Sequence, residues 1–232
     1  MTTGRIYGLG LGPGDPELVT MKAVRLMRSV PVIAYPRTAA GASLVRRIAA
    51  PYLPPGLVEV PLDTPMAVDT APAQAAYDAQ ADLLAAHLDA GRDVALLCEG
   101  DPFLYGSFMY LYDRLADRYE IEVIPGVCSI TACAAAAGLP LAGREDVLTV
   151  LPATLPEETL MRELSETSAA VIMKIGRHIG KVRRVVEALG CMGGATYVER
   201  ALTPEQRVLS LAKVPDGEIP YFSTILVFRD RD

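Results

Sequence analysis

Three loops of this 232-residue chain combine glycine with aspartate, proline and small residues, a composition suited to binding a small molecule. They span residues 8–16 (GLGLGPGDP), 99–106 (EGDPFLYG) and 125–133 (PGVCSITAC). Glycine lets the backbone approach a ligand closely, and Asp101 can accept hydrogen bonds from a ribose hydroxyl or an amino group. For the first two loops, the alternative explanation is a turn that only reverses the chain. For the third loop, the alternative is tight packing of the helix that follows, in place of room for an adenine.

The first loop does not match the common nucleotide-binding motifs. In the two possible registers of G-x-G-x-x-G, Pro13 or Asp15 replaces the third glycine, and no G-K-[ST] follows as in a P-loop. An aspartate facing a pyrophosphate would repel it. The loop therefore favours an uncharged or cationic ligand over a phosphorylated one.

Apolar and amphipathic stretches alternate through the first half of the chain and predict the elements that position these loops. Expected strands cover 5–11, 30–35, 93–98 and 121–124, and expected helices cover 17–28, 42–50, 73–90 and 107–117. The strands lack a polar face, which indicates a mainly parallel sheet covered by helices on both sides. Because ligands bind beyond the carboxyl ends of such strands, the first two loops should meet.

Two details of this half are also predicted. On the helix over 17–28, the side chains of Leu18, Met21 and Val24 share one face, which should pack against the sheet. The proline-rich stretch 51–72 should be a long surface connection.

The second half predicts a different sheet. Expected strands cover 147–151, 169–174, 195–199, 207–211 and 222–228. The last two follow each other without an intervening helix, which favours antiparallel pairing. We therefore expect two α/β domains: an N-terminal domain over 1–120 with a mainly parallel sheet, and a C-terminal domain over 121–232 with a mixed sheet.

Composition and charge exclude several classes of protein. A formal net charge of -6 gives no broad attraction for nucleic acid or an anionic membrane. The uncharged stretch 123–143 is interrupted by proline and glycine and rich in alanine, so it predicts a buried helix rather than a membrane span. The four cysteines form no CxxC pair and suggest neither a zinc site nor a redox dithiol. The N-terminus lacks a secretory pattern, so a cytoplasmic location is expected.

The three loops resemble those of the tetrapyrrole methylases of corrin synthesis, and the resemblance extends over nearly the whole chain. Four longer stretches resemble the branch that methylates C20 of precorrin-2: residues 101–111 (DPFLYGSFMYL), 146–152 (DVLTVLP), 171–178 (VIMKIGRH) and 197–208 (YVERALTPEQRV). The resemblance implies S-adenosylmethionine as the methyl donor, S-adenosylhomocysteine as the product, and no metal. It also implies a cleft between two α/β domains and a homodimer.

By this resemblance, eleven residues align with positions that contact the donor: Pro13, Gly100, Asp101, Pro102, Leu104, Tyr105, Cys128, Ser129, Met173, Ala201 and Thr224. Cys128 and Ser129 depart from the family, which more commonly has Thr or Ser followed by Ala. No general base is identified. His87 is expected on the surface, and His178 lies in a neighbourhood better suited to a role in the site.

The segment 174–184 carries five cationic side chains and no acid, although the protein is acidic overall. We expect Arg177, with His178 and Arg37, to meet the acetate and propionate groups of a tetrapyrrole, because arginine forks match carboxylates. Lys181, Arg183 and Arg184 are expected to form the solvated face of a helix.

Three alternatives remain open at the level of the sequence. The acceptor could be the cobalt-loaded factor II of the anaerobic route, or methylation could occur at another position of the ring. A nicotinamide-dependent oxidoreductase is disfavoured by the incomplete glycine motif. A carrier without catalytic activity would bind both ligands without turnover.

Overall fold

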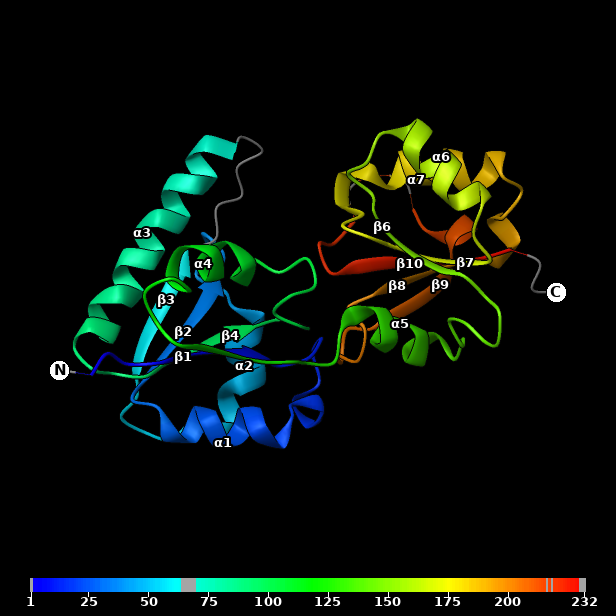
Figure 1. Ribbon diagram of the computed structural model, residues 1–232. Coiled ribbons are helices and arrows are strands. Elements are labelled where there is room, and N and C mark those ends of the chain that lie inside the picture. Colours follow the sequence, from blue (N-terminus) through cyan, green and yellow to red (C-terminus); the bar gives the residue numbers. More distant parts are fainter. Residues whose placement is uncertain (1, 64–69, 216, 218, 230–232) are drawn as a thin grey trace. The chain divides into compact units, whose positions relative to one another are not determined.

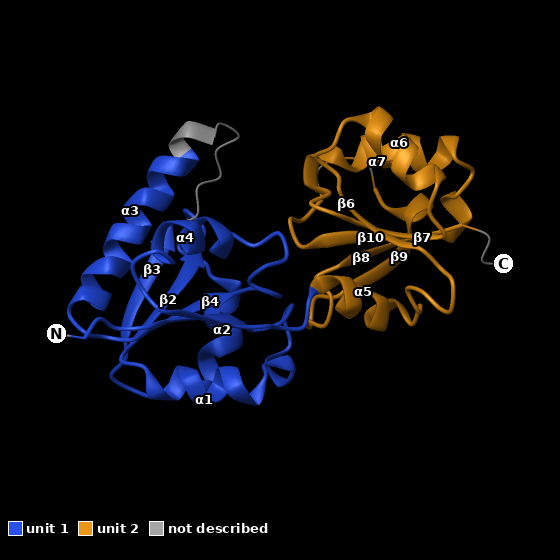
Figure 2. Ribbon diagram, in the orientation of Figure 1, with its two compact units in different colours: residues 1–128 blue, residues 129–232 orange. Residues whose placement is uncertain are grey.

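The computed structural model describes residues 2–63, 70–215, 217 and 219–229, and the chain forms two compact units (Figures 1 and 2). The first unit is Met1–Cys128 and the second is Ser129–Asp232. The strand over 121–124, which a boundary at residue 120 would place in the second domain, is hydrogen-bonded to the first strand of the chain. It therefore belongs to the sheet of the first unit.

The first unit contains a five-stranded sheet in the order β3-β2-β4-β1-β5, and its strand pairs are all parallel. Its strands are β1 (Ile6–Gly10), β2 (Val32–Arg37), β3 (Val58–Asp63), β4 (Val94–Cys98) and β5 (Ile121–Ile124). Its helices are α1 (Met21–Ser29), α2 (Leu44–Ala49), α3 (Thr70–Asp89) and α4 (Phe108–Leu115), with 3-10 turns η1 (Pro16–Leu18) and η2 (Ala50–Tyr52).

Helices cover both faces of this sheet, as its apolar strands predicted (Figure 1). Along β2, Val32 and Ala34 point into one core, with side chains of α3 and α4. Ile33 points into a second core, with side chains of α1 and α2. Because both faces are buried, the strands need no alternation of polar and apolar residues.

Two predictions for this half were wrong. Residues 64–69 of the stretch 51–72 lie outside the described residues, and its described part contains β3. This strand tolerates Pro61 because, within the part of the chain that the structure describes, it lies at the edge of its sheet. The expected helix 17–28 is divided into η1 and α1, and α1 begins after Thr20, whose hydroxyl accepts from the backbone N–H of Ala23. This start turns Met21 outward, with 90% of its surface exposed.

The second unit contains a mixed five-stranded sheet in the order β6-β7-β10-β8-β9. Its strands are β6 (Leu148–Pro152), β7 (Ala169–Met173), β8 (Ala195–Glu199), β9 (Arg207–Ser210) and β10 (Ser223–Phe228). The mixed sheet was predicted, but the expected antiparallel pairing of the last two strands with each other was wrong. Each of β9 and β10 pairs antiparallel with β8, so β8 lies between them.

Helices also cover both faces of this second sheet (Figure 1). They are α5 (Ser129–Ala137), α6 (Glu157–Ser165) and α7 (Ile179–Ala188), with 3-10 turns η3 (Gly176–His178), η4 (Met192–Gly194) and η5 (Leu211–Lys213). Leu160 of α6 and Val182 of α7 belong to the core on one face, whereas the alanine-rich α5 contacts β8 and β10. Among the described residues, no helix is long and apolar enough to cross a membrane.

Candidate active site

The first two loops meet through their backbones at the carboxyl end of the first sheet. The N–H of Gly100 donates to the carbonyl of Gly12 at 2.8 Å, and the N–H of Gly12 donates to the carbonyl of Gly100 at 3.3 Å. This contact follows from the topology, because β1 and β4 are adjacent parallel strands and both loops leave from the same edge. The sequence therefore predicted the meeting of these loops.

The third loop joins the first two through glycines in close contact. A Cβ atom on Gly10 would lie 2.5 Å from the nitrogen of Gly126 and 2.7 Å from the carbonyl oxygen of Gly100. A Cβ atom on Gly126 would overlap the same oxygen of Gly100. Any side chain at Gly10 or Gly126 would force the loops apart, and the sequence analysis had singled out neither residue for this role.

Asp101 ties the second loop to the third. One carboxylate oxygen accepts from the N–H of Phe103 at 2.9 Å, and the other accepts from the N–H of Gly126 at 3.1 Å. The sequence analysis had expected this carboxylate to bind a ribose hydroxyl or an amino group. Both oxygens instead hold the backbone, although each retains a second lone pair that can accept another hydrogen bond.

The other predicted donor-contacting residues of the first unit lie on these three loops. Pro13, Leu104, Tyr105 and Cys128 are half-buried, and Pro102 is buried. Tyr105 adopts a left-handed backbone conformation with φ of 55°, which is uncommon for a residue with a large side chain. Such strain is concentrated at binding sites. In the first loop, Asp15 accepts from the N–H of Glu17 and caps η1.

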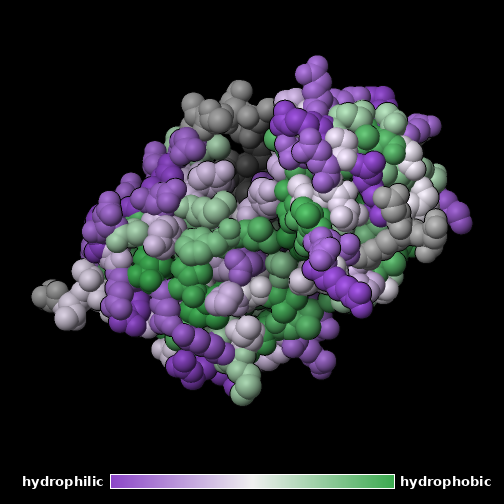
Figure 3. All heavy atoms as spheres, turned by 45° about the vertical axis from the view of Figure 1, so that its right-hand side comes forward, coloured by the Kyte–Doolittle hydropathy of each residue, from purple (hydrophilic) through white to green (hydrophobic). Residues whose placement is uncertain are grey.

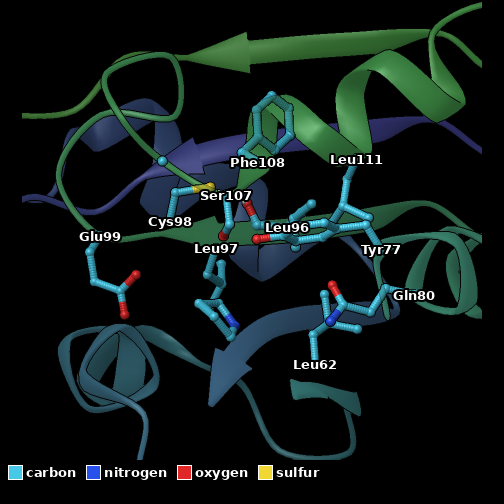
Figure 4. Close-up of a pocket in the computed structure, with 12 residues that line it drawn as sticks. Leu62, Tyr77, Gln80, Leu96, Leu97, Cys98, Glu99, Ser107, Phe108 and Leu111 are labelled. Atoms are coloured by element: carbon cyan, nitrogen blue, oxygen red, sulfur yellow. Dashed lines mark hydrogen bonds between the residues drawn. The ribbon is translucent and has the colours of Figure 1, made fainter. Parts of the chain in front are cut away.

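A small cavity of about 30 Å³ lies beside the second loop (Figure 4). Its polar lining includes Tyr77, Gln80, Cys98, Glu99 and Ser107. Burial raises the pKa of the Glu99 carboxyl, opposed by backbone N–H groups that include that of Val45. Burial also raises the pKa of the Cys98 thiol well above its usual value, so this cysteine is a poor nucleophile.

In the second unit, three of the predicted donor-contacting residues share one edge of the sheet. Met173 is the last residue of β7, Thr224 is the second residue of β10, and Ala201 follows the end of β8 by two residues. Ala201 and Thr224 are 7% and 5% exposed. Ser129 is the first residue of α5 and is half-buried.

The chain leaves this edge in strained conformations. Lys174 follows β7 with φ of 56°, and Arg200 and Leu202 follow β8 with φ of 47° and 58°. Left-handed conformations of such residues cost about 1–3 kcal/mol each, so they persist only where the surroundings fix them. This edge of the sheet therefore carries both the predicted donor-contacting residues and strained backbone that the surrounding residues must hold in place.

A buried polar cluster at this edge was missed by the sequence analysis. The Tyr197 hydroxyl donates to a carboxylate oxygen of Glu199 at 2.8 Å and lies 2.9 Å from the Ser223 hydroxyl. The three residues are at most 5% exposed. Tyr197 and Glu199 lie in the stretch 197–208, which could have pointed to this cluster. The sequence analysis had used that stretch only to identify a branch of the family.

The basic segment 174–184 is largely committed to the fold. Lys181 donates to the carbonyl of Leu155, and Arg183 donates to the carbonyls of Leu211 and Val214. Arg184 forms an ion pair with Glu157 at 2.6 Å. The expectation of a merely solvated face was therefore wrong for Lys181 and Arg183, which are half-buried and join α7 to neighbouring loops.

The predicted substrate-binding residues differ in their surroundings. Arg177 is exposed in η3, and among the described residues it has no ion-pair partner. Partial burial lowers the pKa of His178, and the charges of Lys181 and Arg177 add to this effect. Arg37, at the end of β2, forms two hydrogen bonds with Asp63, at 2.5 and 3.3 Å. A substrate carboxylate would have to compete with Asp63 for this guanidinium.

His87 was expected on the surface, and this was wrong. The side chain is half-buried, and its Nδ1 atom is buried without a hydrogen-bond partner in the part of the chain that the structure describes. Among the residues that the structure describes, no group of three or more His, Cys, Asp or Glu side chains is placed to hold a metal ion.

Exposed aromatic side chains flank the site residues in each unit, and the sequence analysis had not singled them out. Phe103 in the second loop is 49% exposed, and Tyr221, which precedes β10, is 66% exposed. Tyr221 packs edge-to-face against Phe222 with ring centroids 5.1 Å apart. On the face seen in Figure 3, hydrophobic side chains gather in patches among hydrophilic ones. Exposed apolar surface of this kind is suited to contact with a large ligand.

Comparisons with known proteins agree with the resemblance of the loops. The model of the family of tetrapyrrole (corrin/porphyrin) methylases matches residues 5–215. A precorrin-2 C(20)-methyltransferase from Sinorhizobium sp. is 45% identical over 98% of this chain and 97% of its own length. A cobalt-precorrin-2 C(20)-methyltransferase from Salmonella typhimurium is 32% identical over 97% of this chain and 96% of its own length.

Solved structures give the same picture of the fold. A uroporphyrin-III C-methyltransferase from Thermus thermophilus, crystallised with S-adenosylhomocysteine, aligns with a TM-score of 0.72 and 26% identity, covering 97% of each chain. The α/β fold is therefore shared with an enzyme that was crystallised with S-adenosylhomocysteine.

Proposed function

Because this chain belongs to the tetrapyrrole (corrin/porphyrin) methylase family, we propose that it transfers a methyl group from S-adenosylmethionine to C20 of precorrin-2. The product is precorrin-3A, an intermediate of cobalamin biosynthesis, and the second product is S-adenosylhomocysteine. The observation that carries the choice of acceptor is the 45% identity, over almost the full length of both chains, with a protein named for this reaction.

The geometry of the first unit supports the choice of donor. Gly10, Gly100 and Gly126 bring three backbone segments into direct contact at the end of a parallel sheet, so the three loops lie together where ligands bind in such sheets. Asp101 holds two of these segments and retains free lone pairs toward a cationic or hydroxyl-bearing ligand. The first loop lacks a P-loop lysine, which fits S-adenosylmethionine better than a phosphorylated ligand.

Residues of both units contribute to donor binding in this proposal. In the first unit they are Pro13, Gly100, Asp101, Pro102, Leu104, Tyr105 and Cys128, and in the second they are Ser129, Met173, Ala201 and Thr224. Buried and half-buried backbone at these positions can orient the donor and exclude water. S-adenosylmethionine supplies an activated methyl on a cationic sulfur, so the chain mainly has to align the acceptor carbon with it.

The transfer balances without a metal or an oxidant. A bond forms between C20 and the methyl carbon while the bond from the methyl carbon to sulfur breaks, and its electron pair stays on a sulfur that becomes neutral. The proton on C20 then leaves to water or to a base of the protein.

The substrate carboxylates require cations. We propose that Arg177 and His178 of the second unit and Arg37 of the first unit meet acetate and propionate groups. Arg177 is the strongest candidate because it is exposed and unpaired within the described residues. Substituting Arg177→Ala should weaken tetrapyrrole binding about tenfold, since a charge-assisted hydrogen bond contributes about 1.5–3 kcal/mol. An unchanged dissociation constant would remove Arg177 from the site.

Methylation assays with two acceptors test the proposed function. Purified protein is incubated with S-adenosylmethionine carrying a carbon-13 methyl and either metal-free or cobalt-loaded precorrin-2, and NMR locates the new methyl. We expect methylation at C20 and a preference for the metal-free form. A strong preference for the cobalt form would transfer the protein to the anaerobic route, and binding without S-adenosylhomocysteine formation would indicate a carrier.

We also propose that the protein acts as a homodimer in the cytoplasm. Light scattering after size-exclusion chromatography tests this: a mass near twice 24.8 kDa is expected, and a mass of one chain at micromolar concentration would contradict it.

A further inference from the structure

We propose that the buried cluster of Tyr197, Glu199 and Ser223 positions the edge of the second sheet that carries Ala201 and Thr224, and so sets the affinity for the methyl donor. This inference rests on the proposed function. The three residues are positioning residues, because they act through the backbone that bears the donor-contacting side chains.

The cluster connects β8, β9 and β10 at the edge of the sheet where β8 ends and where β9 and β10 begin. Glu199 is the last residue of β8, and its backbone pairs with Arg207 of β9 on one side and with Ser223 of β10 on the other. The Tyr197 hydroxyl, two residues earlier on the same face of β8, joins the side chains of Glu199 and Ser223. The Ser223 hydroxyl also lies 2.7 Å from the carbonyl of Pro220, and its single proton can be donated either to that carbonyl or to the Tyr197 oxygen.

The chemistry of the cluster makes it rigid. Glu199 is 5% exposed and lies 3.6 Å from the guanidinium of Arg207, which balances its charge. Burial raises the pKa of Tyr197 to about 12, so its hydroxyl keeps the proton that it donates to Glu199. Buried polar groups that lose a partner are costly, so this arrangement resists displacement of any member.

The donor-contacting residues are attached directly to the cluster. Thr224 follows Ser223, and Ala201 follows Glu199 by two residues through Arg200, whose left-handed conformation is held by a hydrogen bond from its N–H to the carbonyl of Phe222 at 2.8 Å. If the cluster loosens, Arg200 and Leu202 can relax from their left-handed conformations. Ala201 would then move relative to Thr224.

A second hydrogen bond from a buried tyrosine to a carboxylate, here an exposed one, provides a control away from the site. In the first unit, the hydroxyl of the buried Tyr119 donates to Asp89 at 2.8 Å, and Arg118 lies 3.7 Å from the same carboxylate. Tyr119 precedes β5 and Asp89 ends α3, so this hydrogen bond lies at the amino end of the parallel strands, opposite the three glycine-bearing loops. Removing the hydroxyl of Tyr119 tests what loss of such a bond does away from the site.

The experiment compares Tyr197→Phe, Ser223→Ala and Tyr119→Phe with the full-length wild-type protein. Calorimetric titration with S-adenosylhomocysteine gives the dissociation constant, and thermal unfolding without ligand gives the stability. We expect Tyr197→Phe and Ser223→Ala to raise the dissociation constant at least fivefold. Tyr119→Phe should leave the dissociation constant within twofold, whatever its effect on the unfolding temperature.

Kinetics and a conservative variant separate positioning from general destabilisation. Tyr197→Phe should raise KM for S-adenosylmethionine and leave KM for the tetrapyrrole unchanged. Glu199→Gln, which retains an oxygen to accept from Tyr197, should keep more donor affinity than Glu199→Ala. Equal donor affinity in wild type, Tyr197→Phe and Ser223→Ala would overturn the inference. If the wild-type protein itself fails to bind S-adenosylhomocysteine, the proposed function fails instead.

Discussion

Individual glycines decide whether the three loops can meet. Gly10 and Gly126 are required for space, because a Cβ atom on either would overlap neighbouring backbone, whereas Gly100 adopts a left-handed conformation with φ of 64°. The sequence shows where glycines stand, but it does not show which of them face another backbone. Only the sheet topology identifies Gly10 and Gly126 as contact points.

Substituting Gly126→Ala should therefore abolish donor binding and destabilise the protein by about 1–3 kcal/mol, as expected for overpacking. The new methyl group would overlap the Gly100 carbonyl oxygen, which is backbone and cannot rotate away. Denaturant unfolding and titration with S-adenosylhomocysteine check this. Gly143→Ala is the control, because no atom lies within 4 Å of the added carbon there, and it should leave both values unchanged.

His87 should make the stability of the protein sensitive to mild acid. Burial lowers the pKa of His87 below its ordinary value of 6.5, with a contribution from Arg92. The unfolded chain therefore binds a proton that the folded chain does not, so stability is complete above pH 6.5 and falls as the pH decreases through the folded pKa.

His87→Leu removes both this proton and the unpartnered Nδ1 atom. The free energy of unfolding should fall less between pH 7 and pH 5.5 in the variant than in the wild type, as measured by urea titration at each pH. Parallel pH profiles would show that His87 does not contribute.

At the scale of elements, the start of a helix decides which of its residues are buried. Thr20 caps α1, and the helix buries Ala23, Leu26 and Met27. Of the predicted face, Val24 is only partly buried against the same core and Met21 is exposed. The apolar pattern identified the helix, but the cap fixed its rotation. Which residues of the helix are buried could therefore be learned only from the structure.

Two methionines of α1 give a direct test of this burial pattern. Met27→Ala should cost about 2–5 kcal/mol of unfolding free energy, because Met27 is fully buried. Met21→Ala should stay within about 0.5 kcal/mol, because Met21 is 90% exposed. Both variants replace methionine by alanine, so the difference between their free energies of unfolding, measured with denaturant, reports the difference in burial. Similar losses for both variants would contradict the observed burial pattern.

For the molecule as a whole, binding of the donor or its product should stabilise the folded state. Ligand at about 100 times its dissociation constant adds about 2.7 kcal/mol, which for a chain of this length corresponds to a rise of roughly 5–10 °C in Tm. S-adenosylhomocysteine should produce this shift in a thermal unfolding assay. A shift with NAD instead would support the oxidoreductase alternative.

The sequence by itself determined the two kinds of sheet, the three glycine-bearing loops and the family to which they belong. These features depend on local patterns: apolar runs that fit a buried strand, and turn residues that follow it. The loops had to meet because neighbouring parallel strands end at the same edge.

Only the tertiary structure decided the order of β8, β9 and β10, the rotation of α1 and the partners of the buried polar groups. These depend on contacts between residues far apart in the chain, such as Tyr197 with Ser223 and Asp101 with Gly126. A local sequence pattern does not predict which distant group will form the hydrogen bond that a buried hydroxyl or carboxylate needs. The need for a partner is set by the residue type, and its identity is set by the packing.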